Sequence, residues 1–126
     1  MTYRNLLAAV LSASFLVSAT SAIAADLAAG EKVFKKCKVC HTLEKDGKKK
    51  IGPNLFGIMG RTSGAAEGFK FSKAMTAAAI TWDEGTLTQY LTKPKDFIPG
   101  NKMAFPGLRK PEQIENVIAF IIENTK

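Results

Sequence analysis

The segment Cys37-Lys38-Val39-Cys40-His41 holds both cysteines of the chain and its only histidine. These counts exclude a catalytic pair of histidines. They exclude a zinc site made only of cysteine and histidine, because such sites usually have four ligands and only three are present. They also exclude a small fold stapled by disulfides, because two cysteines this close in sequence cannot tie distant segments together. The chemistry of the segment is therefore local.

The order C-x-x-C-H is the pattern that attaches haem c. Two cysteines three positions apart face the same way from one helical turn, so each sulfur can form a thioether with a haem vinyl group. We expect one haem c, bound covalently through Cys37 and Cys40, with His41 as the proximal iron ligand. The alternatives are a redox-active dithiol, which usually occurs in a βαβ pattern that this chain lacks, a zinc half-site with further ligands, and a chance match.

The second axial ligand has to be another residue type, because His41 is the only histidine. Met59, Met75 and Met103 are the methionines beyond the N-terminal region, and two Pro-Gly pairs bracket Met103. These pairs restrict the loop and limit the entropy lost when the thioether binds. We expect Met103 to bind the iron, with Lys102 as the local rival, and the other two methionines to fill gaps in the core.

Residues 1–25 have the features of a secretory signal peptide. One arginine precedes the apolar run Leu6–Val17, and small residues follow up to an A-x-A site, so we expect cleavage after Ala24 or Ala25. The alternative is a retained membrane anchor, since the uncharged stretch is about long enough to span a bilayer. Cleavage would leave residues 26–126 as one domain in the periplasm, and export agrees with haem attachment outside the bacterial cytoplasm.

Helical spacing dominates the rest of the chain, and no alternating strand pattern extends beyond a few positions, so we expect an all-α fold. Asp26 and Ser72 can each cap a helix with their side-chain oxygens. The first two expected helices cover residues 27–38 and 73–79. A third is expected from a capping box at Thr81–Glu84 to about Leu91, and a last one from Pro111.

The first and last of these helices are expected to pack on each other. Gly30 lies in the centre of the first apolar face and would let two backbones approach closely. Two long loops, 46–68 and 94–106, are rich in glycine and proline. Such loops in a small domain are usually functional or wrapped around a bound group, so we expect a non-protein group in the core. The two apolar faces consist of Leu27, Gly30, Val33, Phe34 and Cys37 in the first helix, and of Ile114, Val117, Ile118, Ile121 and Ile122 in the last.

The chain resembles the class I c-type cytochromes, in the branch shared by mitochondrial cytochrome c and its soluble bacterial relatives. The resemblance extends from Gly30 to Lys126. It implies a small all-α cytochrome c fold, in which crossed N- and C-terminal helices and loops wrap one covalently bound haem. The segments that carry it are Cys37–His41, Gly52-Pro53-Asn54-Leu55, Gly57-Ile58-Met59-Gly60-Arg61, Ile80-Thr81-Trp82 and Pro99-Gly100-Asn101-Lys102-Met103.

The resemblance also implies roles for individual residues. Met103 would be the distal ligand, with Tyr90 beside its sulfur. The carbonyl of Pro53 would accept a hydrogen bond from the imidazole of the proximal ligand and orient the ring. Arg61 and Trp82 would contact a haem propionate.

Three positions depart from the family pattern. Phe71 stands where relatives usually carry a propionate-bonding tyrosine, and Met75 stands where they often carry a buried asparagine. Asn101 replaces a frequent threonine. We therefore expect an altered network of hydrogen bonds around the propionates.

The resemblance implies a soluble periplasmic one-electron carrier rather than an enzyme. Two occupied axial positions leave no iron site for a substrate, and a thioether ligand raises the reduction potential. One alternative is a small haem peroxidase or gas-binding sensor, which needs an open iron site. Another is a membrane-tethered carrier.

The chain is basic, with a formal net charge of +7. We expect a ring of lysines around an exposed haem edge, formed by Lys36, Lys38, Lys50, Lys93, Lys95 and Lys102. Such a ring would dock a monomer, not stably inserted in a membrane, on acidic faces of redox proteins. Examples are a quinol–cytochrome c oxidoreductase, a terminal oxidase and a photosynthetic reaction centre. The run Lys48–Lys50 could suggest nucleic acid, but no interleaved aromatic residues support that reading.

Overall fold

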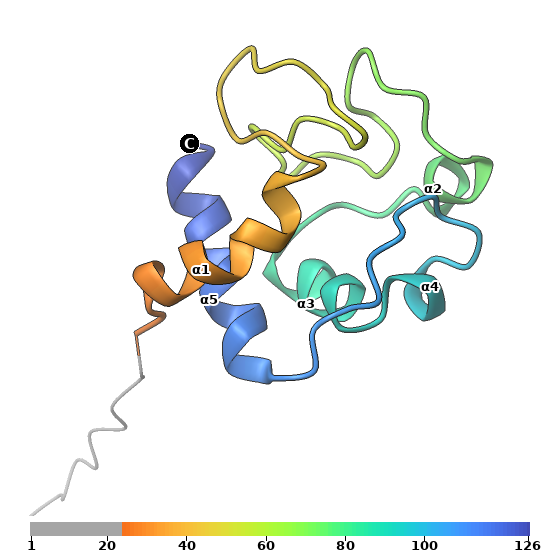
Figure 1. Cartoon of the computed structure of the whole chain (residues 1–126). Helices are drawn as coiled ribbons and strands as arrows, with labels where there is room; N and C mark the ends of the chain where they lie inside the picture. Colours follow the sequence, from red (N-terminus) through yellow and green to blue (C-terminus); the bar gives the residue numbers. More distant parts are fainter. Residues whose placement is uncertain (1–23) are drawn as a thin grey trace, which may run out of the picture.

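The structure is a computed structural model that describes residues 24–126 (Figure 1). The predicted signal peptide therefore lies almost entirely outside the described residues. Within residues 24–126 the only β pairing is a single bridge between Thr62 and Thr81, which confirms the all-α prediction. The helices are α1 (Leu27–Lys38), α2 (Lys73–Ala78), α3 (Glu84–Thr92), α4 (Pro94–Phe97) and α5 (Pro111–Asn124). In this part of the chain, no helix is long and apolar enough to cross a bilayer.

Two of the predicted helix caps are present. An Asp26 carboxylate oxygen accepts a hydrogen bond from the backbone N–H of Ala29 at 2.9 Å. The Ser72 hydroxyl accepts one from Met75 N–H at 3.0 Å. The Asp26 backbone N–H also donates to the side chain of Asn116 at 2.8 Å, so the start of α1 is fastened to α5.

The predicted capping box at Thr81–Glu84 is wrong by two residues. Asp83 is the cap of α3: its carboxylate accepts from Thr86 N–H at 2.7 Å, and the Thr86 hydroxyl accepts from Asp83 N–H at 2.9 Å. No helix begins directly after Thr81, because its backbone pairs with that of Thr62 and Asp83 is still extended, with a φ of −134°. The short helix α4 was not predicted either, because the proline that ends α3 also occupies the first turn of the next helix.

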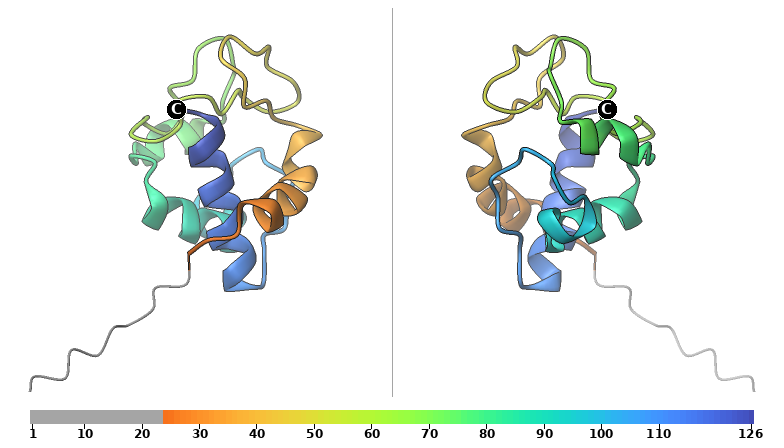
Figure 2. Two further views of the ribbon diagram at one scale, coloured as in Figure 1. Left: turned by 90° about the vertical axis from the view of Figure 1, so that its left-hand side faces the viewer. Right: turned by 90° about the vertical axis from the view of Figure 1, so that its right-hand side faces the viewer.

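The terminal helices cross, and their contact is the most extensive between any two helices of the described chain (Figures 1 and 2). A Cβ placed on Gly30 would lie 2.1 Å from the backbone oxygen of Asn116, so only glycine permits this approach. Beside the crossing, the rings of Phe34 and Phe120 have centroids 5.5 Å apart. Leu27, predicted on the buried face, is 45% exposed because it belongs to the first turn of α1, beyond the crossing.

The loop between α4 and α5 is fastened to α3. A Cβ on Gly107 would lie 2.1 Å from the Thr92 carbonyl oxygen, and Gly107 has a φ of +105°. The next residue, Leu108, donates its N–H to the Leu91 carbonyl at 2.8 Å. The other long loop reaches the end of α5, where the Gly57 N–H meets the carbonyl of Thr125 at 3.2 Å. Both loops are therefore held by backbone contacts.

Candidate functional site

The attachment segment continues the last turn of α1. The carbonyl oxygen of Cys37 accepts hydrogen bonds from the N–H groups of Cys40 at 3.0 Å and of His41 at 2.9 Å. Both thiols are free and partly buried. The turn thus presents two sulfurs and one imidazole within five residues, as the motif predicts.

The imidazole of His41 is held in one tautomer. Its Nδ1 lies 2.8 Å from the Pro53 carbonyl oxygen, and a carbonyl oxygen can only accept, so Nδ1 carries the hydrogen. Nε2 therefore keeps its lone pair. Burial lowers the pKa of His41, although the bond to Pro53 opposes this, so the ring is neutral at pH 7. A neutral, oriented imidazole is what iron ligation requires.

Gly52 fixes the other surface of the ring. A Cβ there would lie 2.5 Å from Cε1 of His41, so the backbone packs directly against the imidazole. The Gly52 N–H donates to the Cys40 carbonyl at 2.8 Å. The loop that carries Gly52 and Pro53 therefore fixes the position of His41, and the contact with Pro53 is the one that the resemblance implied.

Two of the alternatives for the cysteines, a redox-active dithiol and a zinc site, find no support in this geometry. A redox-active dithiol depends on a thiolate with a lowered pKa. Burial instead raises the pKa of the Cys37 thiol to about 11. Zinc would need more ligands, and residues 24–126 contain no cluster of three or more histidine, cysteine, aspartate or glutamate side chains suited to a metal. Thioether formation, which uses the sulfurs singly, fits the site.

Met103 lies beside Tyr90, as the resemblance implied. The Tyr90 hydroxyl is 3.9 Å from the Met103 sulfur, and the ring of Tyr90 packs against that of Trp82 with centroids 5.1 Å apart. Burial raises the pKa of Tyr90 to about 12, so the phenol keeps its proton at ordinary pH. Lys102, the alternative axial ligand, is bonded elsewhere, because its Nζ donates a hydrogen bond to the Lys70 carbonyl at 3.0 Å.

Arg61 is half-buried and partly committed to the backbone. Its guanidinium donates to the carbonyls of Asn54 at 3.0 Å and Phe56 at 3.3 Å. Burial lowers the pKa of Arg61, but a guanidinium stays charged at neutral pH. Its remaining N–H donors suit an anionic oxygen such as a propionate. Trp82 is next to Arg61, since the backbone N–H of Trp82 donates to the Arg61 carbonyl at 2.9 Å.

The apolar side chains around these groups suit a large planar ligand. Phe71 packs edge-on against Phe69, with ring centroids 4.8 Å apart, so the position carries an apolar contact in place of a hydroxyl. Met75 is buried in the core and Met59 packs against it, both as predicted. Several apolar side chains pack on the core yet remain only partly covered: Leu55, Phe71, Ile80, Leu91, Met103 and Phe105. The residues present therefore fit a haem.

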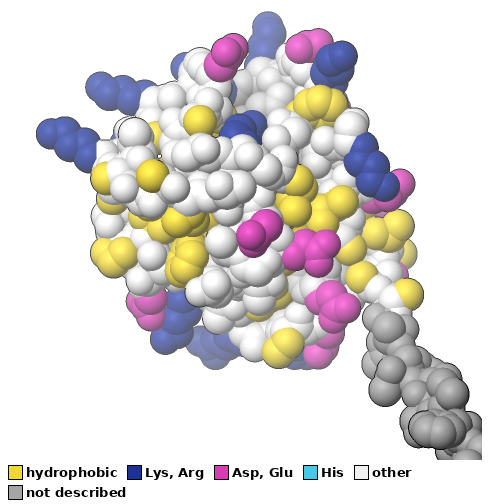
Figure 3. Space-filling view, turned by 180° about the vertical axis from the view of Figure 1, so that it is seen from behind, with side chains coloured by type: hydrophobic (Ala, Val, Ile, Leu, Met, Phe, Trp, Pro, Cys, Tyr) yellow, Lys and Arg dark blue, Asp and Glu magenta, His cyan; other side chains and the backbone are white. Residues whose placement is uncertain are grey.

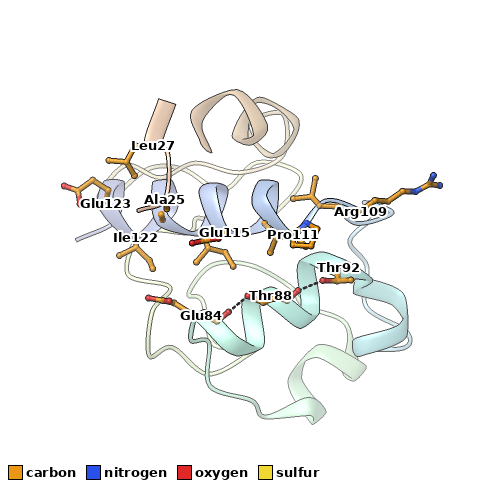
Figure 4. Close-up of a pocket in the computed structure, with 14 residues that line it drawn as sticks. Ala25, Leu27, Glu84, Thr88, Thr92, Arg109, Pro111, Glu115, Ile122 and Glu123 are labelled. Atoms are coloured by element: carbon orange, nitrogen blue, oxygen red, sulfur yellow. Dashed lines mark hydrogen bonds between the residues drawn. The ribbon is translucent and has the colours of Figure 1, made fainter. Parts of the chain in front are cut away.

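Of two hollows on the described surface, the larger lies apart from this group of residues and the smaller includes His41. The larger, of about 750 Å³, lies between α3 and α5, and none of the eight predicted site residues lines it (Figure 4). The hydroxyls of Thr88 and Thr92 on its α3 side are bonded to their own helix at 2.7 Å. The smaller, of about 310 Å³, adjoins His41, with Lys35, Lys38 and Lys50 among its lining residues.

Two asparagines shape the site without having been predicted to. The side-chain amide of Asn54 donates to the carbonyls of Glu44 and Gly47 at 3.0 and 2.8 Å, and its oxygen accepts from Phe56 N–H at 2.8 Å. Asn101 makes a similar set of bonds next to Met103. The available sequence signal was the tendency of asparagine to bond the backbone two residues ahead.

Comparisons with known proteins agree with the geometry. The chain matches the Cytochrome c family over residues 27–124. It is 55% identical to cytochrome c of Chlamydomonas reinhardtii over 81% of this chain and 92% of the relative. It is 44% identical to cytochrome c-554 of Methylosinus trichosporium, over 93% and 89% of the two chains. The structure of cytochrome cH from Methylobacterium extorquens is similar with a TM-score of 0.71 and 43% identity, covering 78% of this chain and 98% of the other. The attachment turn, the oriented imidazole and these likenesses together show that the chain belongs to the cytochrome c family, with one haem c bound through Cys37 and Cys40.

Proposed function

We propose that this electron carrier works in the periplasm and binds its haem iron through His41 and Met103. The observation that carries the proposal is the 2.8 Å contact between His41 Nδ1 and the Pro53 carbonyl, which leaves the lone pair of Nε2 free to bind iron. The thioether sulfur of Met103 is the second proposed ligand atom, and its loop is bonded through the Asn101 side chain to Pro94 of α4. A nitrogen and a sulfur donor together favour ferrous iron and a raised reduction potential.

The bound haem supplies one iron that exchanges a single electron. Pro53 and Gly52 keep the His41 ring in one orientation, and Tyr90 covers the Met103 sulfur from one side. The partly covered apolar side chains around the site exclude water. Because these contacts are built into the fold, little has to rearrange when the charge of the iron changes.

Optical spectra test the proposed ligands against an enzyme with an open iron site. We expect the ferric protein to show the weak long-wavelength charge-transfer band of a sulfur–iron bond. We expect the ferrous protein to bind carbon monoxide only slowly, because the thioether has to leave first. Rapid carbon monoxide binding by the unaltered protein would favour a peroxidase or gas sensor instead.

Docking to partners is proposed to use a basic surface around the attachment segment. All six lysines predicted to form a ring, at positions 36, 38, 50, 93, 95 and 102, are exposed. Lys50 Nζ donates to the Lys38 carbonyl at 3.0 Å, which holds the two segments together. Val39 directly follows Lys38 and Ile51 directly follows Lys50, and the two apolar side chains are exposed by 69% and 76%. An apolar centre with a basic rim suits an acidic protein face, such as that of a quinol–cytochrome c oxidoreductase, a terminal oxidase or a photosynthetic reaction centre.

The opposite side of the molecule has a different charge. On the face drawn in Figure 3, acidic side chains gather near apolar ones, and lysine and arginine project mainly from the periphery. The glutamates that line the larger hollow, Glu84, Glu115 and Glu123, belong to α3 and α5. Three glutamates and one arginine, Arg109, therefore line that hollow, so its lining is acidic on balance, which supports docking of an acidic partner elsewhere on the monomer.

Salt dependence should report this surface directly. We expect oxidation of the ferrous protein by anionic hexacyanoferrate(III) to slow by about tenfold between low and high ionic strength, because screening weakens attraction over roughly 10 Å. A cationic cobalt(III) complex should show the opposite trend. Stopped-flow rates of Lys50→Gln should fall with the anionic oxidant, whereas Lys110→Gln, outside the ring, should match the unaltered protein. A flat salt profile with both oxidants would contradict the proposal.

Export is proposed to remove the signal peptide after Ala24 or Ala25. Either site keeps Asp26, whose carboxylate caps α1, so the folded domain loses no described cap. Intact mass of protein purified from the periplasm should correspond to a chain that starts at Ala25 or Asp26 and carries one haem. A mass that includes residues 1–23, found in the membrane fraction, would show a tethered carrier instead.

A further inference from the structure

Asn101 uses all of its hydrogen-bonding groups although it is only 3% exposed. Its side-chain N–H groups donate to the carbonyls of Pro94 and Ile98, both at 2.8 Å. Its side-chain oxygen accepts from the Met103 backbone N–H at 2.9 Å. Its own N–H donates to Ile98 at 3.1 Å, and its carbonyl accepts from Lys95 Nζ. A buried amide with every group bonded is a rigid connection between segments.

We infer that Asn101 is the positioning residue that holds the Met103 thioether in place for the iron. This inference rests on the proposed function, in which Met103 is the distal ligand. One side chain joins the backbone of the proposed ligand to Pro94, the first residue of α4, and to Ile98, which directly follows α4. α4 is a firm anchor, because Pro94 is among the most completely buried side chains of the described chain.

The same side chain positions the hydroxyl of Tyr90. That hydroxyl has one proton and two acceptors within reach, the Asn101 side-chain oxygen at 3.3 Å and the Met103 sulfur at 3.9 Å. An amide oxygen is the stronger acceptor of the two. Asn101 therefore holds the phenol beside the sulfur while drawing its proton away, which leaves the sulfur lone pairs available for the iron.

Threonine, the residue that relatives frequently carry here, cannot replace these contacts. A single hydroxyl has one proton, so it could donate to Pro94 or to Ile98 but not to both. The amide thus fastens the ligand loop at one point more than a hydroxyl does. Pro99 restricts the chain just before Asn101, and Gly100 supplies the φ of +89° that the turn requires. The loop is held in one conformation by local geometry and by this amide.

Competition with added imidazole measures how firmly the thioether is held. Imidazole can bind the ferric iron only after the sulfur leaves, so a loosened loop raises its apparent affinity. We expect Asn101→Leu, which keeps the number and branching of the side-chain heavy atoms and removes all four side-chain hydrogen bonds, to raise that affinity about tenfold or more. Asn101→Thr should give an intermediate increase.

Ser63→Ala is the matched control. Ser63 is 2% exposed, and its hydroxyl accepts from Ile80 N–H at 3.1 Å, so it is a buried hydrogen-bonding residue outside the 94–103 segment. We expect it to lower the thermal midpoint without changing imidazole affinity. If Asn101→Leu and Asn101→Thr change the affinity no more than Ser63→Ala does, Asn101 is structural only and the inference fails.

The proposed function can fail separately. If Met103→Ala has the same ferric spectrum and imidazole affinity as the unaltered protein, Met103 is not the ligand, and the proposed function falls together with the inference. If Met103→Ala changes both while Asn101→Leu and Asn101→Thr change neither, only the role of Asn101 is wrong. If Asn101→Leu does not fold, Asn101→Thr against Ser63→Ala still decides.

Discussion

Met103→Ala is expected to turn the carrier into a protein with an open iron site. With Met103 as the proposed distal ligand, removal of its sulfur would leave His41 as the only protein ligand, because Lys102 Nζ is bonded to the Lys70 carbonyl. The ferric band of the sulfur–iron bond should disappear, and the ferrous protein should bind carbon monoxide rapidly. The reduction potential should fall by about 0.1–0.3 V, within the ~0.8 V range that axial ligands set, because the donor that favours ferrous iron is lost.

Met59→Ala is the control for this variant. Met59 is also partly buried and packs on the core, so its truncation costs stability without opening the iron. Absorption spectra and potentiometry of the two variants beside the unaltered protein decide the matter. An unchanged spectrum in Met103→Ala, or loss of the band in Met59→Ala, would assign the ligand to another residue.

Gly30→Val is expected to have the largest effect on folding. A Cβ at this position would lie 2.1 Å from the Asn116 backbone oxygen, and backbone cannot move aside as a flexible side chain can. The terminal helices would have to separate along their main contact. Overpacking in a core costs about 1–3 kcal/mol, and here we expect about 3 kcal/mol or more of the 5–15 kcal/mol typical of a domain. The thermal midpoint should fall by about 10 °C or more.

Gly85→Ala is the matched control, because Gly85 is also a helical glycine. A Cβ on Gly85 would meet only the Asp83 side-chain oxygen, at 3.3 Å. Alanine has a helix propensity about 1 kcal/mol better than glycine, so the free energy of unfolding should stay the same or rise by up to about 1 kcal/mol, and it should not fall. Denaturant unfolding of both haem-loaded variants gives the comparison. Equal stabilities for Gly30→Val and the unaltered protein would show that the helices do not cross as closely as described.

The elements that could be predicted depend on neighbours in sequence. The spacing of Cys37, Cys40 and His41 is set within one turn, and the side-chain caps Asp26 and Ser72 bond residues three positions ahead. Helix ends at prolines follow from the missing N–H and from ring geometry. The glycine at the crossing was predictable because it interrupts an otherwise apolar face.

The errors came from competition that only the folded chain reveals. Threonine and aspartate are both good helix caps. Asp83 caps α3, whereas Thr81 forms a backbone bridge with Thr62. Leu27 follows the helical spacing of the buried face, yet it borders the open hollow between α3 and α5 and remains 45% exposed. Periodicity identifies a face but does not say how much of that face a partner covers.

The sequence by itself determined the attachment chemistry, the helical class and the crossing at Gly30, because each follows from residue type and local spacing. The tertiary structure decided which groups surround the ligands. The Pro53 carbonyl meets His41 across twelve positions, Tyr90 meets Met103 across thirteen, and Asn101 joins α4 to the ligand loop. These contacts need closed loops, and loop closure depends on the packing of the whole chain rather than on any segment of it.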